Sequence, residues 1–276
     1  MENICQVCMH HCRLKPGQQG ICRARKNEAG TILCGNYGRV TSLNLDPIEK
    51  KPLKMFHPGS LILSVGSYGC NLRCPFCQNH EISMADESSV EFVQMLPKEL
   101  AERASKYRLV GNLGVAFTFN EPLVGWEYVR DAARLVHDQG MKNIMVTNGS
   151  AELWVLEALL PYIDAMNIDL KGFRPEYYQK LGGDLETVKR SISLAAERCH
   201  VEVTTLLIPG ENGSEEEIRS LAQWLASVDS EIPLHLSRFF PRYQITDRPP
   251  TPVEQVYRLA DVVKKYLKYV YTGNCR

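Results

Sequence analysis

From Leu61 onward the chain alternates short apolar runs with amphipathic stretches, and this alternation limits the fold more than any other feature. The apolar runs contain few polar residues, which is typical of parallel strands under crossover helices. We expect strands at 61–65, 114–119, 143–146, 165–170, 201–208 and 233–239, and helices at 97–107, 127–139, 152–160, 185–198, 215–227 and 253–266. Six such units are fewer than the eight of a closed barrel, so the sequence predicts a partial (β/α)6 TIM-like barrel.

The residues before this barrel have a different composition, rich in cysteine and glycine with weak periodicity. We therefore expect two domains, a small cysteine-rich N-terminal module at 1–58 and the barrel at 59–276. In the module, Cys5, Cys8, Cys12 and Cys22 offer four soft ligands, with the spread of a structural zinc site or of a second iron–sulfur cluster. Zinc is the preferred prediction.

The overall charge excludes several kinds of partner. Formal net charge is zero and the pI is about 7.0, so no basic field favours nucleic acid and no polybasic segment favours a membrane. There is no apolar run of transmembrane length, and the first residues lack the hydrophobic region of a signal peptide. Ten cysteines in such a chain indicate metal or redox work in a reducing compartment, so we expect a cytoplasmic protein.

Three cysteines, Cys70, Cys74 and Cys77, follow the first predicted strand at its C-terminal end, where α/β barrels carry their chemistry. A [4Fe–4S] cluster normally has four cysteine ligands, so three in the spacing Cys-x3-Cys-x2-Cys leave one iron open. An open, redox-active iron beside a bound cofactor is typical of one-electron chemistry. The alternative is a zinc site that takes its fourth ligand from elsewhere, such as His80.

Polar side chains also follow the other predicted strands. Glu121 could hold a cationic ammonium group, and the Thr147 hydroxyl and Asn148 amide could contact a carboxylate or a ribose. Asp169 and Lys171 are two residues apart and share one side of their strand. Asn-Glu-Pro and Asn-Gly are also common turn sequences, so each signal alone is weak. His80 and, on the sixth strand, His235 are further candidates for lining the same cavity.

Together these motifs resemble radical S-adenosylmethionine (SAM) enzymes, in the branch of the pyruvate formate-lyase activating enzyme. The superfamily is indicated by the three cysteines with an aromatic residue, Phe76, before the last one. The branch is indicated by 118–122, 147–149 and 169–171. Three further segments, 46–53, 58–60 and 77–83, are similar to the radical SAM component of the AmmeMemoRadiSam system, and the resemblance covers essentially the whole chain.

This resemblance implies a function. Cys70, Cys74 and Cys77 would hold a [4Fe–4S] cluster whose open iron binds the amino and carboxylate groups of SAM. One electron would then cleave SAM to methionine and a 5′-deoxyadenosyl radical, which abstracts hydrogen from a substrate. The SAM contacts that the resemblance implies are Asn120 and Glu121 at the amino group, Thr147, Asp169 and Lys171 at the carboxylate and ribose, Phe76, Gln78 and Asn79 at the adenine, and Tyr243 near the adenosine.

The resemblance also implies partners. These are an electron donor of the flavodoxin or ferredoxin type and Memo-type and AMMECR-type proteins, with a small molecule, a side chain or a nucleoside as substrate. One alternative is an activase that acts on a glycine of a partner protein. The other is a non-enzymatic zinc-binding module on a barrel scaffold.

Overall fold

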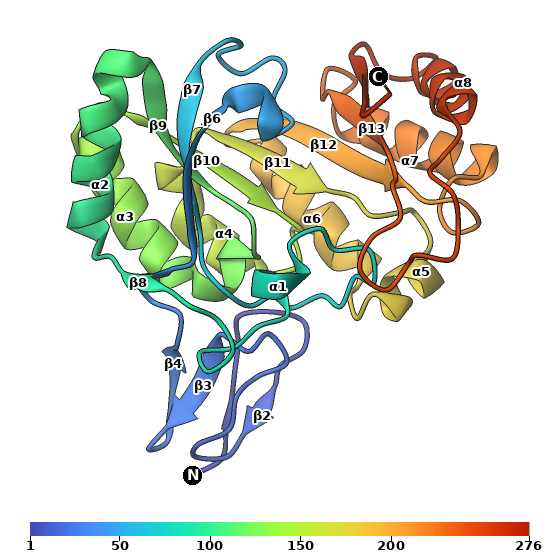
Figure 1. The fold of residues 1–276 in the computed structure, drawn as a ribbon. Helices are drawn as coiled ribbons and strands as arrows, with labels where there is room; N and C mark the ends of the chain where they lie inside the picture. The colour runs from blue at the N-terminus through green and yellow to red at the C-terminus, as the bar shows by residue number, and fades with distance from the viewer. Residues whose placement is uncertain (276) are drawn as a thin grey trace.

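A computed structural model gives the structure of residues 1–275, and its centre is an eight-stranded sheet (Figure 1). The strands of this sheet are β6 (Ser42–Pro47), β7 (Leu61–Gly66), β9 (Asn112–Phe117), β10 (Lys142–Thr147), β11 (Ala165–Asp169), β12 (His200–Leu207), β13 (Leu234–Arg238) and β14 (Val270–Gly273). The strand order is β6-β7-β9-β10-β11-β12-β13-β14. Neighbours from β7 onward pair in parallel, whereas β6 runs antiparallel to β7. The sheet therefore has two edges, β6 and β14, and forms a partial barrel.

The longer helices cover the outer face of the sheet (Figure 1). They are α2 (Pro97–Lys106), α3 (Trp126–Asp138), α4 (Leu153–Leu159), α6 (Leu185–Ala196), α7 (Glu215–Val228) and α8 (Val253–Val263). The chain also forms the short helices α1 (His80–Ser83) and α5 (Pro175–Lys180) and the 3-10 turns η1 (Ile48–Lys50), η2 (Tyr107–Val110), η3 (Pro122–Gly125) and η4 (Leu160–Tyr162). Side-chain caps start two of the long helices, because Asp184 accepts from the Thr187 amide and Ser214 from the Glu217 amide. No helix within 1–275 is both long and apolar enough to cross a membrane.

The predicted fold class is confirmed. The six predicted strands are β7 and β9 to β13, and the six predicted helices are α2, α3, α4, α6, α7 and α8. The sheet contains two strands that periodicity did not predict, β6 and β14. Both lie at edges and are only partly buried, so they lack the continuous apolar run that marks the central strands.

The inside of the barrel is closed at the N-terminal ends of the strands by apolar side chains. Ile62, Ala116, Ile144 and Ala165 project inward from four neighbouring strands, and Ile48 and Leu53 pack on them from the segment that follows β6. The other face of the same strands packs on the helices through residues such as Leu63 and Met145. This alternation leaves the C-terminal half of the barrel interior open for a site.

The N-terminal region carries only short strands. β1 (Asn3–Ile4) pairs with β2 (Arg13–Leu14), β3 (Arg25–Glu28) with β4 (Thr31–Cys34), and β5 (Arg39–Val40) with β8 (Val93–Gln94). β6 falls within the predicted module at 1–58 by number, yet it belongs to the main sheet. The division into 1–58 and 59–276 therefore stays a prediction.

The short strands β2 to β4 of the cysteine-rich region lie at the C-terminal ends of the sheet strands, on the side of α1 (Figure 1). The Glu152 amide donates to the Val7 carbonyl at 3.0 Å, and the Trp154 indole donates to the Gln6 carbonyl at 3.0 Å. A Cβ atom at Gly69 would lie 2.5 Å from the Cys22 carbonyl oxygen. This close approach brings the N-terminal cysteines next to the loop that carries Cys70, Cys74 and Cys77.

Candidate active site

A cavity of about 910 Å³ opens at the C-terminal ends of the sheet strands. Its wall includes all three cysteines of the predicted cluster loop. Of the other predicted site residues it includes Phe76, Gln78, Asn79, Asn120, Glu121, Thr147, Asn148, Asp169 and Lys171. These side chains come from positions 76 to 171 of the chain, and the parallel strands gather them at one end of the barrel.

The cysteine loop presents its sulfur atoms to this cavity. The Leu72 amide donates to the Cys70 sulfur at 3.4 Å, and the Asn148 side-chain amide donates to the same sulfur at 3.6 Å. Burial raises the pKa of Cys70 well above its usual value and that of Cys74 to about 11. The free thiols are therefore protonated at neutral pH, and a metal centre must displace those protons to bind. Three sulfurs in one loop, with amide donors beside them, fit a [4Fe–4S] cluster.

Glu121 is the most buried acid of the cavity wall, with 3% of its surface exposed. Its carboxylate accepts hydrogen bonds from the Leu123 amide at 3.0 Å, the Thr147 hydroxyl at 2.6 Å and the Asn148 amide at 2.8 Å. It caps the turn η3, so the Asn-Glu-Pro turn is real, and the same carboxylate also reaches the end of β10. Burial raises the pKa of Glu121 to about 7, because the three hydrogen bonds only partly offset the loss of solvation.

This pKa makes SAM binding depend on pH. An ionised Glu121 accepts a hydrogen bond from the amino group of SAM better than a protonated one, so we expect the dissociation constant of SAM to rise as the pH falls below 7. The amino group must also be neutral to bind iron, and its ordinary pKa is about 8, so affinity should keep rising up to about pH 8. Titration calorimetry on reconstituted protein measures this dependence. An unchanged affinity between about pH 5.5 and 7 would contradict it.

The same shift has a defined effect on stability. The pKa of Glu121 in the folded protein lies above its value of 4.5 in an unfolded chain. Its contribution to stability is therefore full below about pH 4.5 and is lost as the pH rises through 7. A ligand that donates a hydrogen bond favours the charged carboxylate, so the gain in melting temperature on adding SAM should be larger at about pH 7.5 than at pH 6.

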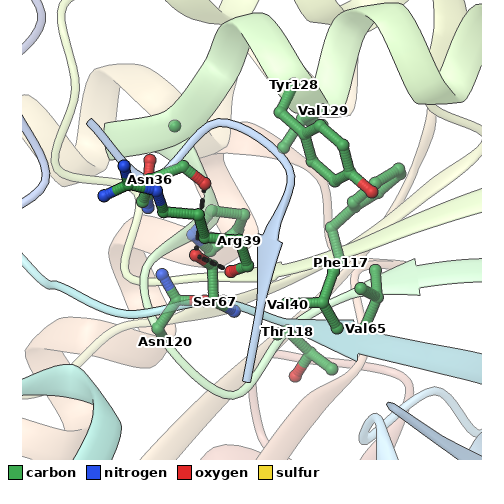
Figure 2. A pocket seen from close by; sticks show the side chains of 13 residues that line it. Asn36, Arg39, Val40, Val65, Ser67, Phe117, Thr118, Asn120, Tyr128 and Val129 are labelled. Atoms are coloured by element: carbon green, nitrogen blue, oxygen red, sulfur yellow. Dashed lines mark hydrogen bonds between the residues drawn. The ribbon is translucent and has the colours of Figure 1, made fainter. Parts of the chain in front are cut away.

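Asn120 fixes the chain just before the cysteine loop. Its side-chain oxygen accepts from the Ser67 amide at 2.9 Å, and its amide group donates to the carbonyls of Tyr68 and Gly69 at 3.1 Å. Ser67 in turn donates to the Arg39 carbonyl at 2.6 Å. Figure 2 shows this side of the motif, where Asn120 and Ser67 border a small pocket of about 30 Å³. Asn120 therefore holds the loop in position, and its contact with the amino group of SAM stays a prediction.

Asp169 and Lys171 form the charged pair at the end of β11. The Lys171 ammonium lies 2.7 Å from the Asp169 carboxylate, and both side chains line the cavity. Ile168 and Leu170 pack on the other face, as the alternation along the strand predicts. Burial lowers the pKa of Lys171, but the charge of Asp169 and its hydrogen bond outweigh the burial, so the net pKa is raised and the ammonium stays charged.

Not all of the residues predicted to border the adenine and the adenosine line the cavity. Phe76, Gln78 and Asn79 line the cavity, and the Asn79 amide donates to the Phe119 carbonyl at 2.8 Å. Tyr243 is not among the residues that form the cavity wall in the described chain. It stacks on His80 with ring centroids 4.2 Å apart. The predicted contact of Tyr243 with the adenosine remains untested, and so does His80 as a fourth zinc ligand.

Three of the four N-terminal cysteines, Cys5, Cys8 and Cys22, are buried, and the Cys5 amide donates to the Cys12 carbonyl at 2.9 Å. Burial raises the pKa of Cys8 to about 12, against an opposing hydrogen bond from the His10 backbone. Within 1–275 no three histidine, cysteine, aspartate or glutamate side chains converge closely enough to hold a single metal ion. The zinc site therefore stays a prediction.

The sequence missed several residues of the cavity wall. Lys51 enters it from the segment after β6, Asn167 and Thr204 lie on β11 and β12, and Tyr271 lies on β14. Asn167 and Thr204 stand inside two predicted strands, and their inward direction could have been read from the alternation with Ile168 and Val203. Lys51 and Tyr271 belong to segments for which no strand or site was predicted. His235, one of the two histidine candidates, does line the cavity.

The sequence is similar to a known protein family and to several known proteins. Residues 64–224 match the Radical SAM superfamily. An uncharacterized protein of Methanocaldococcus jannaschii is 38% identical over 273 residues, which cover 98% of this chain and 80% of that protein. Pyruvate formate-lyase 1-activating enzyme of Escherichia coli K12 is 26% identical over 160 residues, 56% of this chain and 65% of that enzyme.

A solved structure agrees in fold. The crystal structure of Streptococcus suis SuiB bound to S-adenosylmethionine superposes with a TM-score of 0.60 at 16% sequence identity. The match covers 77% of this chain and 52% of that one. At this identity the likeness concerns the fold, and it includes the partial barrel whose open end carries the cavity.

Proposed function

The chain belongs to the radical SAM superfamily, and from that premise we propose that it cleaves SAM reductively to abstract a hydrogen atom from a substrate. Members of this superfamily are enzymes that use a [4Fe–4S] cluster and SAM, and this chain is an enzyme of that kind. The proposal depends on the residues that line one cavity. They combine the sulfur atoms of Cys70, Cys74 and Cys77 with the Glu121 carboxylate and the Lys171 ammonium.

Each of these side chains has a role in the proposal. The three cysteines hold the cluster, which supplies one electron to SAM when it is bound. The buried Glu121 carboxylate accepts a hydrogen bond from the amino group of SAM, and Lys171, kept charged beside Asp169, pairs with the SAM carboxylate. Thr147 and Asn148 hold Glu121 in place through hydrogen bonds. Phe76 and Gln78 border the adenine.

Formation of 5′-deoxyadenosine tests the proposal. The protein is reconstituted anaerobically with iron and sulfide, then mixed with SAM and dithionite, and the product is quantified by mass spectrometry. We expect 5′-deoxyadenosine and methionine in equal amounts, and none when dithionite is left out. Protein that carries about four irons per chain yet forms no 5′-deoxyadenosine would contradict the proposal.

We further propose that the N-terminal module at 1–58 carries a structural zinc ion on Cys5, Cys8, Cys12 and Cys22, with a second iron–sulfur cluster as the alternative. The spacing of the four cysteines and the burial of Cys5, Cys8 and Cys22 as free thiols support a metal centre of either kind. We expect metal analysis of aerobically purified protein to give about one zinc per chain, with little iron–sulfur absorbance. Two clusters per chain after anaerobic reconstitution, with no zinc, would contradict the zinc assignment.

The proposed partners follow from the resemblance of segments 46–53, 58–60 and 77–83 to the AmmeMemoRadiSam component. They are Memo-type and AMMECR-type proteins, together with a flavodoxin or ferredoxin as electron donor in the cytoplasm. Co-expression with such partners, followed by metabolite analysis, tests the association. A metabolite profile that the partners leave unchanged would count against it.

A second candidate function is suggested by the likeness to pyruvate formate-lyase 1-activating enzyme. In that case the hydrogen atom would come from a glycine of a partner protein, and the product would be a glycyl-radical enzyme. Electron paramagnetic resonance separates the two candidates. A stable glycyl radical signal on a co-expressed partner would favour the activase.

A further inference from the structure

A layer of polar side chains crosses the barrel interior at the level of the charged pair of β11 and just beneath it, because Thr204 pairs in register with Asp169. Asn167 lies two residues before Asp169, so it is about 6.6 Å deeper along the same face of the strand. The side-chain amide of Asn167 donates to the Thr204 hydroxyl at 2.9 Å. Thr204 pairs in register with His235, and His235 with Tyr271. All four side chains line the cavity that holds the cysteines.

The side chains of this layer are more polar than those that usually fill the interior of a barrel. One level deeper, the same barrel is filled by Ile62, Ala116, Ile144 and Ala165, the kind of packing that stabilises barrel interiors. Polar groups at the next level cost solvation unless they have partners. The Asn167 side-chain oxygen is buried and has no hydrogen-bond partner among the described residues, a cost that a donor from a ligand would relieve.

A buried cation completes the layer. Lys51 lies between the fully buried Ile48 and Leu53, and only 5% of its side chain is exposed. Its ammonium lies 2.9 Å from the Asp46 carboxylate and 4.7 Å from the centre of the Phe119 ring. Phe119 belongs to the turn that carries Asn120 and Glu121. Lys51 therefore reaches the cavity from below, beside the predicted SAM site.

A hydrogen bond to Glu202 orients the His235 ring in the same layer, so that its other ring nitrogen can donate or accept a hydrogen bond. Its Nε2 lies 2.6 Å from the Glu202 carboxylate, which also accepts from the backbone amides of Lys54 and Met55. Burial raises the pKa of Glu202, but these hydrogen bonds and one from His200 lower it to about 2. The ionised carboxylate orients the His235 ring and leaves its Nδ1 for another partner.

We propose that this layer is the substrate site, and that it binds a small polar molecule carrying one anionic group and at least one hydroxyl or amino group. Lys51 pairs with the anionic group, which is a carboxylate or a phosphate. Asn167, Thr204 and His235 contact the hydroxyl or amino group. Lysine and arginine side chains outnumber aspartate and glutamate in the cavity wall, which also favours an anion.

The site deepens the proposed function and rests on it. A substrate in this layer lies below SAM along the barrel axis. In the reaction one C–H bond of the substrate breaks, and one C–H bond forms at C5′ of the deoxyadenosyl radical. The electron that generates this radical comes from the flavodoxin or ferredoxin donor. A protein glycine is the alternative occupant, and the experiment distinguishes it.

Deuterium transfer into 5′-deoxyadenosine tests the site. An extract of the source organism grown in D₂O is divided by ultrafiltration into small-molecule and macromolecular fractions, and each is added to the reconstituted enzyme with SAM and dithionite. We expect deuterated 5′-deoxyadenosine with the small-molecule fraction only, and loss of the label when an anion exchanger has first removed its anions. Phosphatase treatment removes the label if the anionic group is a phosphate monoester and leaves it if the group is a carboxylate.

Variants test whether the transfer of deuterium depends on the residues of this layer. Lys51→Met should lower the deuterated fraction at least tenfold while unlabelled 5′-deoxyadenosine still forms, and Lys51→Arg should restore most of the label. Lys142→Met is the matched control, because Lys142 also pairs with an aspartate, Asp164 at 2.7 Å, but does not belong to the cavity wall. We expect at most about a threefold effect from it. Thermal unfolding and SAM binding verify that each variant is folded.

Several outcomes would overturn the inference. These are label from the macromolecular fraction, label that survives removal of anions, no label from any fraction, and an unchanged label in Lys51→Met. In each of these cases 5′-deoxyadenosine still forms. Absence of 5′-deoxyadenosine under every condition would instead contradict the proposed function.

Discussion

Replacing Cys74 by alanine is expected to lower the rate of 5′-deoxyadenosine formation at least about a thousandfold, which corresponds to about 4 kcal/mol in activation free energy. The loop supplies three cysteine sulfurs to the cavity, and a cluster that needs one open iron cannot lose one of its three protein ligands. The buried thiol is small, so its removal should change folding little. The measurements are the iron content per chain and the initial rate after anaerobic reconstitution.

Cys199→Ala is the matched control for this substitution. Cys199 is also a partly buried free thiol, but it lies just before β12, outside both cysteine groups. We expect it to keep the wild-type iron content and rate to within about twofold. Equal losses in the two variants would mean that general damage, not loss of a ligand, explains the effect of Cys74→Ala.

The second large effect is expected at Gly69, the residue before the first cysteine of the loop. Its φ of +91° is costly for any residue with a side chain, by about 1 kcal/mol. An added Cβ would also lie 2.5 Å from the Cys22 carbonyl oxygen and 3.0 Å from the Ala24 Cβ. Adding the cost of overpacking, we expect Gly69→Ala to lower the free energy of unfolding by about 3 kcal/mol, as measured by urea denaturation.

Gly111→Ala separates the two contributions. Gly111 has the same φ of +91°, but no atom lies within 4 Å of the position of its added Cβ. Gly111→Ala should lower the free energy of unfolding only by the cost of the positive φ, about 1 kcal/mol. Because Gly69 also contacts the N-terminal region, Gly69→Ala should reduce the iron content after reconstitution, whereas Gly111→Ala should not. Similar stability and iron content in both variants would rule out the steric contact as the cause.

The central fold was predictable because its signal is local. The six inner strands carry apolar runs that are buried on both faces, and the helices between them show one apolar stripe each. β6 and β14 were missed because edge strands need only one covered face, and a short run such as Val270–Gly273 resembles a loop in sequence. The turn that Glu121 caps also has a local signal, the Asn-Glu-Pro sequence itself.

The interior of the site was less predictable, since it depends on contacts between distant segments. Lys51 reaches the cavity only because the chain after β6 folds back into the barrel between Ile48 and Leu53. Asn120 carries the residue type expected at the SAM amino group, but the direction of its amide depends on where Ser67 and Gly69 lie. Residue type and spacing predict which residues gather, whereas their hydrogen-bond partners come from the whole fold.

The contact between the N-terminal cysteines and the barrel also sets an order of events during synthesis. Gln6 and its partner Trp154 are separated by 148 residues. At the usual rates of translation, roughly 7 to 30 seconds pass between the synthesis of the two. During that interval Cys5, Cys8, Cys12 and Cys22 have no barrel to cover them. Their thiols are then open to metal and to oxidant, because the residues that later cover them have not yet been synthesised.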